Sequence, residues 1–262
     1  MVSDEEQIFG FHAVDEALRA GEPLRRIIIG KHRERDPRLA GLLANAHGRK
    51  IPIIFEDSNG ARRGGRGEHH QHVSAVLPPF AYTPWADVRA QVRAAKSALV
   101  VAIDHLEDPQ NLGAVLRNAE GAGADAIVMP ERRNAAVTAV TRKTAAGAAS
   151  HLKIARVPNI VAALEALKGD GCWVTGLSPA PGALPYDEAD YTSKCALVVG
   201  AEGKGLSRLV GEHCDALVRI PLHGRVASLN AASAAAVVFF EVARRQRRAT
   251  QAETGRSSFI DR

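Results

Sequence analysis

Cysteine is scarce in this sequence: its 262 residues include three, Cys172, Cys195 and Cys214, and no CxxC pair. Their spacing of about twenty residues excludes a disulfide framework and a zinc ribbon, so we expect reduced and mostly buried thiols. The histidines do not complete a metal site either, because no carboxylate or cysteine is suitably spaced around those at 69, 70 and 72. We therefore expect no metal.

Long hydrophobic runs are also absent. No stretch of about 18 apolar residues occurs, which excludes a transmembrane helix of the usual length. The first residues are acidic, whereas a secretory signal begins with a basic region followed by an apolar run. A cytoplasmic location and the lack of a membrane partner are therefore the default expectations.

Three common catalytic signatures are missing. No GxGxxG fingerprint follows the first strand expected in the C-terminal half, which argues against a nicotinamide-dependent enzyme. The glycine-rich stretch at 198–207 is not a phosphate-binding P-loop, because Lys204 is followed by Gly205 where a serine or threonine is required. No GxSxG nucleophile elbow occurs.

What is present is an ordinary globular composition with a basic balance. Hydrophobic residues make up 46% and charged residues 24%, and the length suits two domains with separate cores. The formal charge of +5 and pI of about 9.3 favour a polyanionic partner such as RNA. Arginine and lysine gather in four clusters, at 25, 26 and 31, at 62, 63 and 66, at 132 and 133, and at 244, 245, 247 and 248.

The first 78 residues predict a small α/β domain. Apolar residues recur at helical spacing over 8–18 and 36–48, and short β-branched or apolar runs that predict strands lie at 27–29, 51–55 and 73–77. A glycine- and arginine-rich stretch at 59–67 interrupts this pattern, and its glycines predict disorder.

Residues 79–96 predict a linker, because Pro79 and Pro84 interrupt regular structure before a short helix at 88–95. From 97 to 250 apolar runs alternate with helical segments, which is typical of a parallel sheet buried on both faces. We expect a final helix from 229 to about 248, a flexible tail at 251–262, and strands at 98–103, 126–129, 152–157, 173–177, 196–199 and 216–220.

Three segments of this larger domain carry polar residues where ligands of parallel sheets bind. In the first, DHLEDPQNLGAVLRNAEGAG at 104–123, Asp108 and Pro109 predict a helix start that places Asn111 at the helix N-terminus. Arg117 follows six residues later and projects only obliquely from the same side. The alternative interpretation of Arg117 is a surface residue, as for most single arginines in helices.

The second segment, VVGAEGKGLS at 198–207, has three glycines that let a backbone approach a ligand closely. Its Glu202 favours a neutral or cationic ligand over a phosphate, although a plain tight turn would also explain the glycines. The third segment, RIPLHGRVASLNAASAAA at 219–236, leads from a strand into an alanine-rich helix. Ser228 is either a functional residue or the N-cap of that helix.

These three segments, in this order and spacing, closely resemble the signature motifs of the SPOUT superfamily of RNA methyltransferases, in its branch that methylates ribose 2′-hydroxyls. Residues 8–18, IFGFHAVDEAL, resemble the start of the RNA-binding domain, of the ribosomal protein L30e type, that 23S rRNA guanosine 2′-O-methyltransferases of this branch carry. The resemblance covers nearly the whole chain.

The resemblance implies an S-adenosylmethionine cofactor, a deep trefoil knot in the parallel sheet domain, and a homodimer with an active site shared across its interface. Transferred onto matching positions, it implies that Gly200, Ile220 and Leu229 line the cofactor pocket. The implied catalytic residues are Asn111, Arg117, Glu202, Ser228 and Asn230. Arg117 is implied as either general base or phosphate clamp, because an arginine keeps its proton in water.

The sequence departs from the family pattern in two segments. Ala231 and Ala232 follow the SLN triplet where relatives usually have valine and serine, and His72 stands where the small domain commonly has glycine. Three alternatives to 23S rRNA methylation remain at this stage: a tRNA methyltransferase, a drug-resistance rRNA methyltransferase, and a non-catalytic RNA-binding factor in ribosome assembly. The polar set around the glycine loop argues against the last.

Overall fold

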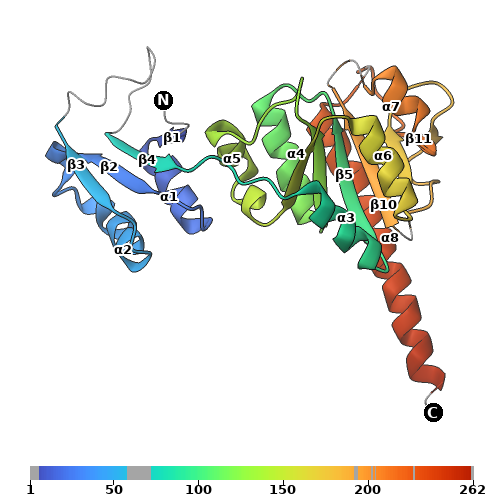
Figure 1. Cartoon of the computed structure of the whole chain (residues 1–262), viewed down its shortest axis with the longest axis horizontal. Coiled ribbons are helices and arrows are strands. Elements are labelled where there is room, and N and C mark those ends of the chain that lie inside the picture. The colour runs from blue at the N-terminus through green and yellow to red at the C-terminus, as the bar shows by residue number, and fades with distance from the viewer. Residues whose placement is uncertain are drawn as a thin grey trace.

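The computed structural model of the protein contains two β-sheets, each with its own hydrophobic core. It describes residues 6–57, 72–191, 194–201, 203, 205–226 and 228–260, with only the backbone described at 250 and at 252–260. Figure 1 shows the smaller sheet at one end of the molecule and the larger at the other, joined by an extended segment after β4. The glycine- and arginine-rich stretch at 59–67, His69, His70 and Glu202 lie outside the described residues.

The smaller sheet has four strands in the order β1-β4-β2-β3. β1 and β2 pair antiparallel with β4, whereas β3 pairs parallel with β2. Two α-helices cover one face of the sheet and bury Val14, Leu18, Leu42 and Ala46 against Ile27. The elements are β1 (Glu6–Phe9), α1 (Phe11–Arg19), β2 (Arg26–Gly30), the 3-10 helices η1 (Lys31–Arg33) and η2 (Pro37–Leu39), α2 (Ala40–Gly48), β3 (Ile53–Glu56) and β4 (Val73–Leu77).

The helix predicted from residue 8 begins later, and this prediction was wrong for Ile8 and Phe9. Both belong to β1, where Ile8 pairs with Ala75 of β4. Gly10 then adopts a φ of +98°, which glycine tolerates best, and the chain turns into α1. Helical spacing of apolar residues cannot reveal a strand whose partner lies more than sixty residues away.

The larger sheet has seven strands, all parallel, in the order β7-β6-β5-β10-β8-β11-β9. Its strands are β5 (Ala98–Asp104), β6 (Ala126–Pro130), β7 (Lys153–Val157), β8 (Trp173–Leu177), β9 (Leu184–Pro185), β10 (Lys194–Gly200) and β11 (Ala216–Arg219). Its helices are α3 (Trp85–Ala94), α4 (Pro109–Gly121), α5 (Ala139–Ala145), the 3-10 helix η4 (Ala148–Ser150), α6 (Ile160–Gly169), α7 (Arg208–Glu212) and α8 (Ala231–Ile260).

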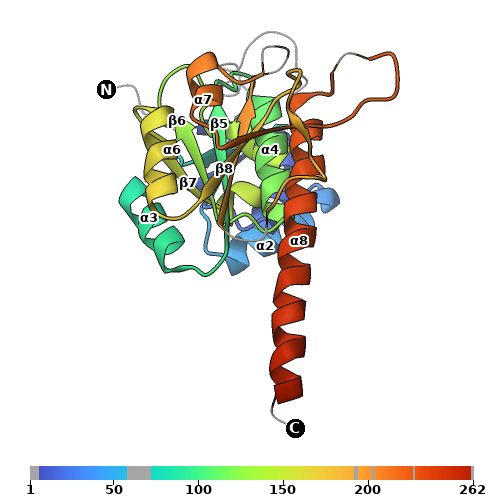
Figure 2. The same cartoon turned by 90° about the vertical axis from the view of Figure 1, so that its right-hand side faces the viewer.

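This sheet is buried on both faces, as the unbroken apolar runs predict. On β5, Leu99 and Val101 belong to the core under α4 and α8, whereas Val100 and Ala102 belong to the core under α3 and α6. Figure 2 shows the sheet between these two helix pairs. The predicted α/β fold with a parallel sheet and a small N-terminal unit is confirmed.

Two further predictions about the larger unit need correction, one on its strands and one on its last helix. The two-residue strand β9 was missed, because Leu184 and Pro185 are too short a run to stand out. The last helix was expected to end near residue 248, but α8 continues to Ile260 and runs past the sheet (Figures 1 and 2). Residues 249–254 contain no glycine or proline to end it earlier.

Among the described residues, no helix combines the length and apolar character needed to cross a bilayer.

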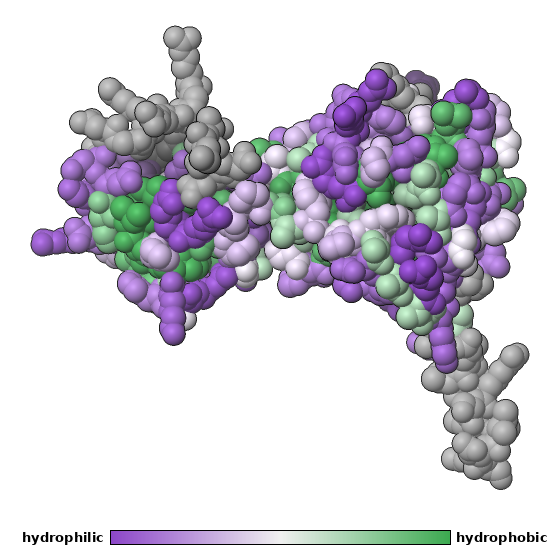
Figure 3. Space-filling model, in the orientation of Figure 1, coloured by the Kyte–Doolittle hydropathy of each residue, from purple (hydrophilic) through white to green (hydrophobic). Residues whose placement is uncertain are grey.

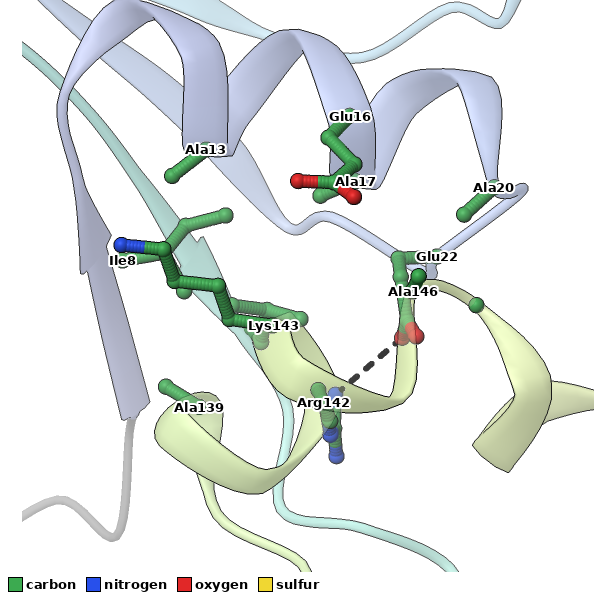
Figure 4. A pocket seen from close by; sticks show the side chains of 12 residues that line it. Ile8, Ala13, Glu16, Ala17, Ala20, Glu22, Ala139, Arg142, Lys143 and Ala146 are labelled. Carbon is green, nitrogen blue, oxygen red and sulfur yellow. Dashed lines mark ion pairs between the residues drawn. The ribbon is translucent and has the colours of Figure 1, made fainter. Parts of the chain in front are cut away.

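The two units contact each other through a buried ion pair. Figure 4 shows Arg142 of α5 directed toward Glu22, which follows α1 in the small unit. Their side chains are 4% and 6% exposed, and Arg142 Nη1 lies 3.5 Å from Glu22 Oε2. Arg142 Nη2 donates to the carbonyl of Pro78 at 3.1 Å, and Ser150 Oγ donates to Glu22 Oε1 at 3.1 Å. The guanidinium also lies 5.3 Å from the centre of the Phe80 ring.

The surface of the small unit is not uniformly polar. Figure 3 shows hydrophobic residues on its visible face, over the region of β2 and β3, where Ile54 is 39% exposed. The opposite face of this sheet packs against α1 and α2. At least one large apolar side chain of β3, that of Ile54, is therefore exposed outside the core of the small unit.

Candidate active site

The first predicted segment forms the end of β5 and the start of α4, as expected. Asp108 caps α4, because its carboxylate accepts from the backbone N–H groups of Gln110 at 3.1 Å and Asn111 at 3.2 Å. Pro109 is the first helical residue, where its missing N–H costs nothing. Asn111 is thereby held at the helix N-terminus, where it is half-buried.

The third predicted segment begins α8, and the structure decides which residue caps it. Asn230 Oδ1 accepts from the backbone N–H of Ala232 at 2.9 Å and of Ser233 at 3.3 Å. The cap is therefore Asn230, and the alternative that Ser228 serves as the N-cap is excluded. Asn230 Nδ2 then donates to Asn111 Oδ1 at 2.9 Å. Two residues 119 positions apart, each at the start of a helix, thus meet side chain to side chain.

The second predicted segment folds back on itself after β10. Ala201 pairs with Gly205, whose N–H donates to the Ala201 carbonyl at 2.9 Å. A Cβ atom on Gly200 would lie 2.2 Å from the carbonyl oxygen of Gly205 and 2.7 Å from the backbone nitrogen of Leu206. Glycine is therefore required at position 200 because any side chain would clash with the backbone of the loop, and not because of its φ angle. Glu202, predicted here as catalytic, lies outside the described residues.

A small apolar cavity of about 90 Å³ lies at the carboxyl ends of β8 and β11. Three predicted site residues line it, namely Ile220, Ser228 and Leu229. Gly200 is not among its lining residues, although the loop that it begins comes close: a Cβ atom on Gly205 would lie 3.7 Å from Pro179, which lines the cavity. The other lining residues are Leu177, Ser178, Arg219, Leu222 and Ala234.

A larger groove of about 540 Å³ borders the described ends of the glycine loop. Asn111 lines this groove together with Gly205, and neither residue lines the apolar cavity. Sequence reasoning missed three of its residues, Asp104, His105 and Arg133. The signal available for the first two was their place directly after a buried strand, in the same segment as Asn111.

Arg117 lies apart from both spaces. It is exposed on α4 and lines neither the apolar cavity nor the groove. Six residues separate it from Asn111, which corresponds to about 9 Å along the helix axis. Within one chain the structure therefore brings together Asn111, Asn230, Ser228, Leu229 and the glycine loop, but it does not bring Arg117 to them.

No metal-binding group accompanies these residues. Across the described ranges, no three His, Cys, Asp or Glu side chains are placed to hold a metal ion. Apolar walls and small residues make up the cavity, which suits an organic ligand, whereas charged side chains line the groove beside the two asparagines.

The fold and the site define a class of protein: an α/β protein whose ligand site is built from loops at the carboxyl edge of a parallel sheet. Residues 98–240 match the SpoU rRNA Methylase family, and residues 7–83 match the family described as RNA 2′-O ribose methyltransferase substrate binding. The chain belongs to the SpoU rRNA methylase family and is an RNA methyltransferase. The resemblance to this type of enzyme inferred from the motifs is confirmed.

The descriptions of two similar proteins agree with this assignment. A protein of Mycolicibacterium smegmatis named uncharacterized tRNA/rRNA methyltransferase is 40% identical over 92% of this chain and 77% of its own length. A protein of Mycobacterium tuberculosis strain H37Rv with the same description is 39% identical over 93% of this chain and 75% of its own length.

Solved structures share the fold over nearly the whole chain. An S-adenosylmethionine-bound rRNA methyltransferase from Sinorhizobium meliloti superposes with a TM-score of 0.70 and 25% identity, over 92% of this chain and 87% of that one. The SpoU methyltransferase AviRb from Streptomyces viridochromogenes, in complex with the same cofactor, has a TM-score of 0.74 and 24% identity over 92% and 90%.

Proposed function

We propose that this protein transfers a methyl group from S-adenosylmethionine to the 2′-hydroxyl of a ribose in structured RNA, with a guanosine of 23S rRNA as its target. The observation that carries this proposal is the contact between Asn111 and Asn230, which unites two predicted motifs beside an apolar cavity and a polar groove. In this proposal the cofactor binds at the apolar cavity and the nucleotide at the polar groove.

The residues present fit S-adenosylmethionine. Ile220 and Leu229 supply apolar walls for a flat nucleobase, and Ser178 and Ser228 add hydroxyl groups at the rim. The absence of a side chain at Gly200 lets the loop backbone close on the ligand. When bound, the cofactor supplies a methyl group on a cationic sulfonium, and Glu202 carries a charge that complements it.

The two units divide the work in this proposal. Residues 1–78 bind RNA through its shape, its phosphates and its 2′-hydroxyls, residues 79–96 link the units, and residues 97–250 catalyse the transfer. The match of residues 7–83 to a substrate-binding family supports this division. The relatives' names cover both tRNA and rRNA, so tRNA is the second candidate substrate.

We propose that the active site is completed in a homodimer. Arg117 lies outside both spaces within one chain, so a second copy would have to supply this particular arginine to the nucleotide. Apolar side chains remain exposed along the start of α8 and the segment before it, with Val226 64%, Val237 37% and Phe240 49% exposed. Their burial in a dimer would remove this apolar surface from water.

The catalytic roles in this proposal are those that the family resemblance implies. Asn111, Ser228 and Asn230 orient the ribose by hydrogen bonds, and Glu202 orients the reacting groups. Because a guanidinium keeps its proton, Arg117 acts by clamping the phosphate next to the target ribose. We also propose a trefoil knot in the larger unit and an L30e-like fold for the smaller one, as the family resemblance implies. A cytoplasmic location is proposed as the default expectation from the sequence.

The test is a methyl-transfer assay with radiolabelled S-adenosylmethionine, using rRNA and tRNA from cells that lack the gene. We expect methylation of 23S rRNA at one ribose, and we expect Arg117→Ala to abolish it while calorimetry still detects cofactor binding. Arg208→Ala, which removes an exposed arginine of α7, is the matched control and should retain activity. Methylation of tRNA instead would refute the rRNA assignment, and substantial turnover by Arg117→Ala would refute the role of that arginine.

A further inference from the structure

The groove beside Asn111 contains a histidine in an unusual backbone conformation. His105 has a φ of +58°, and residues other than glycine rarely adopt this region because their Cβ meets the backbone. Among the described residues, five that are not glycine have a positive φ, and two of them, His105 and Arg133, line this one groove. Backbone strain of this kind persists where the surrounding structure enforces it, often at functional sites.

Neighbouring hydrogen bonds enforce the conformation of His105. The next residue, Leu106, donates its N–H to Asn134 Oδ1 at 2.8 Å, and its carbonyl accepts from Ala135 N at 2.8 Å. The preceding residue, Asp104, is 1% exposed at the end of β5, and its Oδ2 accepts from the Ser207 N–H at 2.6 Å. The chain is therefore fixed on both sides of the histidine.

The side chain of His105 is held as well. Its Nδ1 contacts the second carboxylate oxygen of Asp104, whereas the imidazole as a whole is 36% exposed toward the groove. An ionised carboxylate can only accept a hydrogen bond, so Nδ1 carries the proton in this contact. In the neutral ring, Nε2 then has the free lone pair. A carboxylate orients a histidine in the same way in the Ser-His-Asp hydrolases.

The reaction needs such a lone pair, because the 2′-hydroxyl must lose its proton as it is methylated. The charged groups that line the groove with His105 are Asp104, Glu107, Asp108 and Arg133. Asp104 and Asp108 are occupied by backbone N–H groups, and an arginine does not accept a proton. Carboxylates as a class are far weaker bases near neutral pH than imidazoles.

We propose that His105 is a further catalytic residue, whose Nε2 accepts the proton of the ribose 2′-hydroxyl. This inference rests on the proposed function. The hydroxyl oxygen forms a bond to the methyl carbon while the carbon–sulfur bond breaks, and its electron pair stays on sulfur as the sulfonium becomes a neutral thioether. The proton moves to Nε2, Asp104 stabilises the resulting imidazolium, and water removes the proton afterwards. Arg117 then needs only to hold the phosphate.

The test uses His105→Asn in the full-length protein. Asparagine tolerates a positive φ better than most residues, so the loop should keep its shape while the base is lost. With saturating RNA and cofactor, we expect the single-turnover rate to fall about 10² to 10⁴-fold, the usual contribution of a general base. The Kd for RNA should stay within about threefold of the unchanged protein, and added imidazole should restore part of the rate.

His213→Asn is the matched control, because His213 Nδ1 lies 2.8 Å from Glu165 in a second histidine–carboxylate pair outside the groove. It should leave the rate unchanged. Nitrogen-15 NMR of the unaltered protein adds a measurement that does not depend on folding of a variant, and it should show the Nδ1–H form of His105 in the neutral ring.

Three results would overturn the proposal: an unchanged rate for His105→Asn, a loss confined to RNA affinity, or the Nε2–H form in the NMR spectrum. If His105→Asn does not fold, the NMR result decides. If the unaltered protein methylates no RNA, the proposed function itself is wrong. If it methylates RNA but His105→Asn does so at the same rate, only the role of His105 is wrong.

Discussion

The ion pair between the two units gives a prediction whose magnitude follows from its burial. In Glu22→Gln the carboxylate that faces Arg142 is lost, while a side chain of nearly the same size remains. Both side chains are almost fully buried, and Nη1 and Nε of Arg142 have no hydrogen-bond partner among the described residues. The guanidinium would therefore keep its charge without the carboxylate that now compensates it.

Removal of one partner from a buried pair typically costs about 3–5 kcal/mol. Two neighbours reduce this cost. The Phe80 ring lies 5.3 Å from the guanidinium. The half-buried Glu6 is a second carboxyl that interacts with the charge of Arg142: burial raises its pKa, and Arg142 lowers it by a smaller amount. We therefore expect about 3 kcal/mol, at the lower end. Since about 1.4 kcal/mol corresponds to a factor of ten, separation of the two units should become roughly 100-fold more frequent.

Limited proteolysis of the linker measures this directly. Under conditions where separation is faster than cleavage, the cleavage rate at residues 78–84 reports the population of separated units. The rate should rise roughly 100-fold in Glu22→Gln and return toward the original value in the double variant Glu22→Leu with Arg142→Met. Apolar residues of similar volume commonly replace a buried pair without loss of stability.

Glu16→Gln is the matched control. Glu16 lines the same small cavity between the units (Figure 4) but is exposed, so the cleavage rate of the linker in Glu16→Gln should not change. A cleavage rate for Glu22→Gln within about twofold of the original would show that the pair does not hold the units together. The reasoning from burial would then be wrong.

Three shorter predictions concern the larger unit. Gly200→Ala should abolish cofactor binding measured by calorimetry while the circular dichroism spectrum is kept, because its Cβ would lie 2.2 Å from the Gly205 carbonyl oxygen. The hydrogen bond from Arg89 lowers the pKa of Asp170 in the folded protein. This bond therefore stabilises the fold fully above the ordinary pKa of an aspartate, and the stabilisation is lost as the pH falls through the lowered pKa. Acid titration of Asp170→Asn should therefore show a shallower loss of stability. Burial raises the pKa of the Cys195 thiol to about 12, so it should not react with thiol reagents at pH 7 until the protein is denatured.

Much of the fold could be predicted because it depends on residues that are close in sequence. The run at 98–103 is apolar throughout because β5 is buried on both faces, and Asp108 followed by Pro109 begins α4 by a bond within three residues. The three cysteines were expected as reduced and mostly buried thiols, and two are buried and one half-buried, all free.

Site residues with distant partners were harder to predict. Ser228 and Asn230 are equally suitable caps in the sequence, and only the position of α8 selects Asn230 and brings it to Asn111. Asp104 was not singled out, because its partner Ser207 lies 103 residues later. The strand order places β10 next to β5 and so brings these two loops together.

The sequence by itself determined the class of fold, the family and most of the polar residues at the carboxyl edge of the sheet, since hydrophobic periodicity, helix caps and motifs are local properties. The tertiary structure decided which of those residues meet. It separated Arg117 from the groove, placed His105 in it, and buried Arg142 against Glu22, because strand order and helix packing set distances that neighbours along the chain do not determine.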